Sequence, residues 1–199
     1  MISNFSSLLT KKLFEKGFIQ DEDFELYEYA FFMMSSYSFF LVIAIVVGVL
    51  TNIPLPSFVF YVSFCVVRNF AGGVHADSEF KCLIFTTASV ILSIIVIKTL
   101  IDLNCLLLPL LMMLFSIIIL ILLSPVDTHN KKLSSHERDI FRRKTIILVT
   151  FIVGVFFIMV IIKIMSIAIA LSVAMLLAAI LVVIGKIKLK TENCKKKSA

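Results

Sequence analysis

The sequence contains an apolar run from Thr145 to Ile184 that a single charged residue, Lys163, interrupts. One helix of 40 residues would be about 60 Å long, roughly twice the hydrocarbon core of a bilayer. The run therefore predicts two membrane-spanning helices that fold back on each other near Lys163.

The composition supports the same class of protein. Hydrophobic residues make up 60% of the chain and charged residues 16%, whereas soluble domains have about 45–50% and 25%. This excludes a soluble globular protein, a disordered chain and a soluble nucleic-acid binder. The formal net charge of +6 then indicates orientation in the membrane and contact with anionic lipid of the inner leaflet, with no nucleic-acid partner.

Four further apolar segments precede this run, which gives six expected spans in an all-α, polytopic membrane protein. They are Ala30–Leu50, Ile53–Val67, Cys82–Ile101 and Cys105–Leu123. The second segment is short, because its 15 residues give about 22 Å of helix. It either continues through Ala71 or is re-entrant.

The distribution of Lys and Arg favours six full spans. With a cytoplasmic N-terminus, 17 of the 19 basic residues fall inside, and only Lys98 and Lys163 fall outside. A re-entrant second segment would place six basic residues of the 125–144 connection outside, against the positive-inside rule. We therefore expect a multi-pass membrane protein with both termini in the cytoplasm.

This topology divides the chain into three parts: residues 1–29, the spans 30–184, and a basic tail 185–199. In the first part, apolar residues recur at helical spacing with lysines between them, which predicts an amphipathic interfacial helix that ends near Gly17. The alternative is a frayed, solvated N-terminus. We expect no cleavable signal peptide, because this part lacks an apolar core region.

The stretch from Arg68 to Cys82, the first residue of the third span, contains one histidine and one cysteine, His75 and Cys82. A cysteine attacks carbonyl carbon as a thiolate, and a nearby imidazole takes its proton. In one continuous helix, residues seven apart are about 10.5 Å apart along the axis, so contact requires a bend. Gly72 and Gly73 indicate irregular backbone there, and Cys82 falls where a helix N-terminus would lower a thiol pKa.

Structural roles are the alternative for both residues. Cys82 is then the first apolar residue of a span and His75 an interfacial side chain. A metal site is not expected, because His129, His136 and Cys194 lack the spacing of metal ligands.

The connection after the fourth span contains Pro125, Asp127 and the pair Lys131 and Lys132. One interpretation is a basic loop that only sets topology. The other is a docking segment for an acidic peptide. The basic tail is expected to bind lipid or to set topology.

The motif Arg68-x-x-x-Gly-Gly-x-His-Ala, followed by Cys82 seven residues after the histidine, resembles the AgrB family of accessory gene regulator proteins. The Pro-x-Asp after the fourth span, the basic residues beyond it, the length and the hydropathy profile agree with that family.

The resemblance implies a cysteine endopeptidase of a bacterial cell membrane, free of cofactors, that cleaves the C-terminal part of a quorum-sensing peptide precursor and helps close a thiolactone or lactone ring. It implies Cys82 as nucleophile and His75 as base. Gly72, Gly73, Asp127, Lys131 and Lys132 are expected to support the site or the substrate. Arg68 either binds a substrate carboxylate or anchors the topology.

The precursor, of the AgrD type, is the expected partner, together with a second copy of the chain in a homodimer. The rival hypothesis is a non-catalytic peptide exporter or membrane scaffold. The few ionisable residues in the spans disfavour a charged translocation path.

The six-span topology predicts opposite labelling at two positions. A cysteine introduced by Ser134→Cys should resist a membrane-impermeant maleimide in intact cells, because residue 134 lies inside, whereas Asn52→Cys should react. Labelling of position 134 from outside would contradict the topology.

Overall fold

A computed structural model describes residues 2–18, 20, 23–72, 79–126 and 134–197, with the backbone alone at 2–5, 79–82, 135 and 192–197. Within these residues the secondary structure is entirely helical. The helices are α1 (Ile2–Glu15), α2 (Phe24–Leu50), α3 (Pro54–Ala71), α4 (Glu79–Leu103), α5 (Leu107–Leu123), α6 (Ser135–Ile161) and α7 (Met165–Lys197). The expected all-α, polytopic class is confirmed.

Each of the six predicted apolar segments forms a helix. Five of these helices, α2, α3, α4, α6 and α7, are long and apolar enough to cross a membrane. The shorter α5 has 17 residues, which gives about 26 Å. Helix α3 continues to Ala71, so that its 18 residues reach about 27 Å and resolve the question of its length.

The fold-back near Lys163 is confirmed. Lys163 has a φ of 62°, its N–H donates to the Val160 carbonyl, and the Ile164 N–H donates to the Met159 carbonyl. These two bonds form a Schellman motif, in which a left-handed residue ends a helix and satisfies its last carbonyls. Asn52, with a φ of 60°, ends α2 with the same bond pattern.

Helix α6 begins ten residues before the apolar run that the sequence indicates. Ser134 and Glu137 form a capping box, with Glu137 N–H to Ser134 Oγ at 3.2 Å and Ser134 N–H to Glu137 Oε2 at 3.0 Å. This pair satisfies two free donors of the first turn, so the helix starts in polar sequence. At the other end of the chain, α7 continues through the basic tail as far as Lys197.

The chain divides into two units, Met1–Ile43 and Ala44–Ala199. In the first unit, α1 ends before Gly17, which has a φ of 73°, and the Phe14 and Phe24 rings meet edge to face. The predicted end of this helix is therefore confirmed. Its position at a membrane surface stays a prediction.

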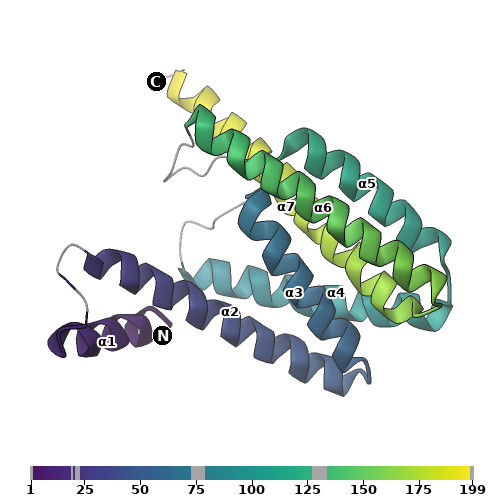
Figure 1. The fold of residues 1–199 in the computed structure, drawn as a ribbon, viewed down its shortest axis with the longest axis horizontal. Helices are drawn as coiled ribbons and strands as arrows, with labels where there is room; N and C mark the ends of the chain where they lie inside the picture. Colours follow the sequence, from purple (N-terminus) through teal and green to yellow (C-terminus); the bar gives the residue numbers. More distant parts are fainter. Residues whose placement is uncertain (1, 19, 21–22, 73–78, 127–133, 198–199) are drawn as a thin grey trace. The chain divides into compact units, whose positions relative to one another are not determined.

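Helix α7 is the centre of the second unit. It packs against α3, α4, α5 and α6, and Figure 1 shows it alongside α6. In the most apolar stretch of α7, 72% of the residues are buried, compared with 39% or less in the corresponding stretches of the other long helices. Small residues on α7 allow this close packing, among them Ala168, Ala174 and Ala178, each at most 2% exposed.

The turn between α2 and α3 depends on a glycine. A Cβ at Gly48 would lie 2.7 Å from Ser57 Cβ, whereas a Cβ at Gly154 in α6 meets nothing within 4 Å. Gly48→Ala should therefore destabilise the protein by about 1–3 kcal/mol through overpacking. Gly154→Ala, the matched control, should leave stability unchanged or slightly raised.

The measurement is the thermal unfolding midpoint of the full chain in detergent. Equal midpoints for the two variants would contradict the close approach of α2 and α3.

Candidate functional site

The site begins where α3 ends. Gly72 follows Ala71 with a φ of 77° and a ψ of −165°, a backbone conformation that is essentially restricted to glycine. Its N–H donates to the Arg68 carbonyl at 3.1 Å. Helix α3 ends at Ala71 because the backbone of Gly72 is not helical.

The last carbonyl of α3 is satisfied by another part of the chain. Ala71 O accepts the Val126 N–H at 3.1 Å and the Ser124 hydroxyl at 3.3 Å. Ser124 and Val126 directly follow α5 and are buried. This is the partner that a carbonyl at a helix end needs once it is removed from water.

A third segment joins through a threonine of α6. Ser124 Oγ lies 3.4 Å from Thr145 Oγ1, and Thr145 Oγ1 donates to the Phe141 carbonyl of its own helix at 2.9 Å. We call Ala71, Gly72, Ser124, Val126 and Thr145 the α3–α5–α6 junction.

The junction leaves no space for a side chain on Gly72. A Cβ built there would lie 2.5 Å from the Val126 carbonyl oxygen, and backbone cannot move aside as a flexible side chain can. Gly72 is therefore fixed by both its conformation and the close approach of the 124–126 backbone.

Aromatic and cationic groups surround the same end of α3. The Phe70 and Phe141 ring centroids are 6.5 Å apart, and Lys144 Nζ lies 5.7 Å from the Phe70 ring. The half-buried Arg68 places its Cζ 5.9 Å from the Phe64 ring. The attraction between a cation and the face of an aromatic ring stabilises these contacts. The two cations give this end of the helices a positive charge.

The predicted site residues fall partly within this description. Gly72 lies in the junction, and Arg68 lies one helical turn before it. Cys82 is the fourth residue of α4, of which the backbone is described. Five predicted residues lie outside the described residues: Gly73, His75, Asp127, Lys131 and Lys132.

Sequence reasoning missed Ser124 and Thr145 as partners. Both stand at the edge of an apolar segment, a position that any helix boundary can occupy, and they are separated by 21 residues. The signal that was available is their polarity next to Pro125 and to the start of the apolar run. That signal does not identify which carbonyl Ser124 meets.

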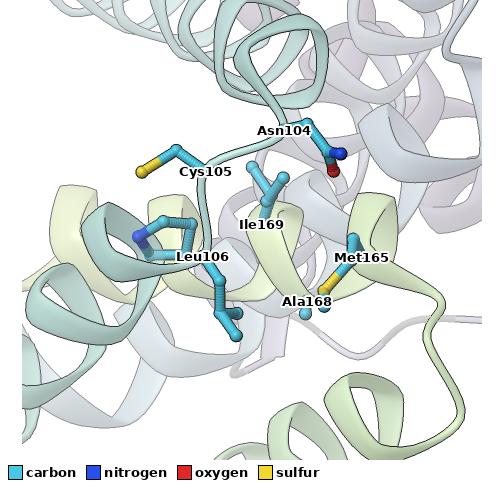
Figure 2. Close-up of a pocket in the computed structure, with 7 residues that line it drawn as sticks. Asn104, Cys105, Leu106, Met165, Ala168 and Ile169 are labelled. Carbon is cyan, nitrogen blue, oxygen red and sulfur yellow. The ribbon is translucent and has the colours of Figure 1, made fainter.

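A small pocket between the α4–α5 turn and α7 is lined mainly by apolar side chains. Figure 2 shows Asn104, Cys105 and Leu106 of the turn opposite Met165, Ala168 and Ile169 of α7. Its volume of about 20 Å³ suits a single water molecule. Within the described ranges, no three His, Cys, Asp or Glu side chains gather in a way that could hold a metal ion.

The part of the chain that the structure describes contains five long apolar helices and one shorter one, which define a multi-pass membrane protein as the class. It belongs to the AgrB family, accessory gene regulator B, whose family model matches residues 6–184. A Clostridium perfringens (strain SM101 / Type A) protein described as AgrB-like is 24% identical over 146 residues, which cover 69% of this chain and 67% of that protein. No solved structure matches the chain. Membership of the family connects the chain with the processing of autoinducing peptides.

The contact at Gly72 predicts a local effect of substitution. Gly72→Ala should displace residues 124–126, and the Val126 amide should exchange its hydrogen faster because its bond to Ala71 O is weakened. Gly17→Ala is the matched control, because Gly17 also has a positive φ but a Cβ there meets nothing within 4 Å.

Hydrogen exchange followed by mass spectrometry on the peptide that ends at Val126 makes the measurement. Unchanged exchange in Gly72→Ala would show that the 124–126 backbone does not lie against Gly72.

Proposed function

We propose that this protein is a membrane cysteine endopeptidase that removes the C-terminal part of a quorum-sensing peptide precursor and promotes ring closure of the remaining peptide. The observation that carries the proposal is the start of α4 at Glu79, which places Cys82 in the first turn of that helix. The N-terminal end of a helix bears unpaired N–H groups and partial positive charge, which favour a thiolate over a thiol.

In the first step, the Cys82 thiolate attacks the scissile carbonyl carbon of the precursor. His75 first takes the proton of the thiol and then gives it to the leaving amine. A carbon–sulfur bond forms, the carbon–nitrogen bond breaks, and the N-terminal part of the precursor remains on Cys82 as a thioester.

In the second step, a cysteine thiol of the bound peptide gives its proton to His75 and attacks that thioester, and the new carbon–sulfur bond forms as the bond to Cys82 breaks. Exchange between two thioesters is nearly isoenergetic, whereas hydrolysis is strongly downhill, so the acylated site must exclude water. A hydroxyl in place of the peptide thiol would give a lactone by the same step. The Cys82 thiolate is thereby released, and no atom changes its oxidation state.

The oxyanion of each step needs donors that are already oriented. Backbone N–H groups of the first turn of α4 and of the Gly72–Gly73 segment are our candidates. Arg68 is a candidate partner for a substrate carboxylate, because a guanidinium binds carboxylates through two parallel hydrogen bonds. Asp127, Lys131 and Lys132 would support an acidic part of the precursor.

The reaction would occur at the cytoplasmic face, where the positive-inside rule places the connections on both sides of the junction. Two basic residues lie against aromatic rings of α3 near the junction, Arg68 against Phe64 and Lys144 against Phe70. Anionic lipid would contact the same basic residues. A homodimer is the proposed assembly.

The test is acylation of Cys82. Wild-type protein given a precursor whose ring-closing Cys is replaced by Ala should accumulate a hydroxylamine-labile adduct at Cys82, because the second step is blocked. His75→Gln should insert normally and form that adduct about 10²–10⁴ times more slowly at neutral pH, which is the range for general base catalysis. Mass spectrometry identifies the acylated peptide.

The remaining cysteines provide the controls. Cys65 lies within α3, Cys105 in the α4–α5 turn and Cys194 near the end of α7. Cys65→Ala, Cys105→Ala and Cys194→Ala should therefore still cleave the precursor. Cys82→Ala should not. Full cleavage by Cys82→Ala would end the peptidase proposal and favour the exporter, and acylation of His75→Gln at the wild-type rate would remove His75 as the base.

A further inference from the structure

The junction joins the two connections that carry the proposed site residues. The connection that follows Gly72 carries His75, and the connection that follows Val126 begins with Asp127. We propose that Ser124 and Thr145 are positioning residues of the peptidase, which fix the starting points of these two connections relative to each other. This inference rests on the proposed function.

Covalent geometry gives the junction its influence over the site. A chain spans at most about 3.6 Å per residue, so a residue three positions after Gly72 lies within about 11 Å of it. Asp127 is bonded directly to Val126. A shift at the junction therefore moves the origin of the connection that carries the proposed base. It also moves the origin of the connection that carries the proposed substrate contacts.

The bonding of Ser124 differs from that of three other buried serines. Ser57, Ser116 and Ser172 each donate to a carbonyl three or four residues earlier in the chain. Ser124 instead reaches Ala71 O, 53 residues away in sequence, and lies beside Thr145 Oγ1. A hydroxyl with this placement connects separate segments, whereas the usual placement only satisfies the hydroxyl within its own helix.

The two hydroxyl groups at the junction, those of Ser124 and Thr145, have one proton each to donate. Thr145 Oγ1 gives its proton to the Phe141 carbonyl, so toward Ser124 it acts as an acceptor. Ser124 has one proton and two acceptors, Ala71 O at 3.3 Å and Thr145 Oγ1 at 3.4 Å. Removal of this hydroxyl deletes the side-chain link from Ala71 O to Thr145 Oγ1 but leaves the Val126 N–H bond to Ala71 O in place.

Because of this arrangement, a substitution can change the position of the reacting groups without a large change in the stability of the fold. Ser124→Ala should keep the fold, because the backbone bond between Val126 and Ala71 remains. The reacting groups should be held less accurately, which lowers kcat. KM should stay unchanged, because the remaining Val126 N–H bond to Ala71 O still holds the start of the connection that carries the proposed substrate contacts. Loss of one neutral hydrogen bond corresponds to a decrease of about fivefold.

The experiment compares four variants of the full chain in lipid vesicles with the synthetic precursor. Ser124→Ala is paired with Ser116→Ala, since Ser116 is buried on α5 but donates within its own helix to Met112 O at 2.6 Å. Thr145→Val, which lacks the hydroxyl, is paired with Thr145→Ser, which keeps it. We expect a lower kcat with unchanged KM in Ser124→Ala and Thr145→Val, and near wild-type kcat in Ser116→Ala and Thr145→Ser.

Equal kcat values for Ser124→Ala and Ser116→Ala would overturn the inference, as would a decrease in Thr145→Ser as large as that in Thr145→Val. A kcat that follows the fraction of unfolded protein, measured on the same samples, would also overturn it. Cys82→Ala is run beside them. Cleavage by that variant would overturn the proposed function and this inference together, whereas an inactive Cys82→Ala with a fully active Ser124→Ala would overturn the inference alone.

Discussion

The burial of α7 among α3, α4, α5 and α6 is the interaction on which the second unit depends. Apolar surface gains little by leaving lipid, so helices in a membrane associate through close van der Waals packing, which small residues permit. The buried alanines of α7, from Ala168 to Ala179, meet that requirement in the first half of the helix, and the apolar part of α7 is far more buried than those of its neighbours. The other helices then present most of their apolar surface to lipid, which explains the many large hydrophobic side chains exposed on the isolated chain.

The same low-dielectric surroundings explain the junction. A carbonyl at the end of a helix costs several kcal/mol if it is buried without a donor, so the end of α3 must either reach water or find a partner. Ala71 is fully buried, and its carbonyl finds two donors after α5. A requirement of helix termination thereby brings together two connections that the sequence separates by more than 50 residues, and it makes their joining a part of the proposed site.

Sequence alone predicted the elements that follow from composition and local chemistry. The six apolar segments, the end of the first helix near Gly17 and the fold-back at Lys163 were found where hydropathy, glycine and chain length indicated. The start of α6 was missed because a capping box initiates a helix in polar sequence, where hydropathy gives no signal. Of the proposed site, the sequence predicted that Cys82 lies at the start of a helix, as it does in α4, and it named Arg68 and Gly72 as supporting residues, whose roles stay predictions. It did not identify Ser124 or Thr145.

The sequence by itself determined that the chain spans a membrane with helices, where most of them begin and end, and which family its motif resembles. These properties depend on the transfer of side chains from water and on hydrogen bonds within a few residues, both of which are local. Only the tertiary structure decided that α7 is central and that Ala71, Ser124 and Thr145 meet. Such contacts depend on which helix faces pack together, and that choice is made by shape complementarity between distant segments.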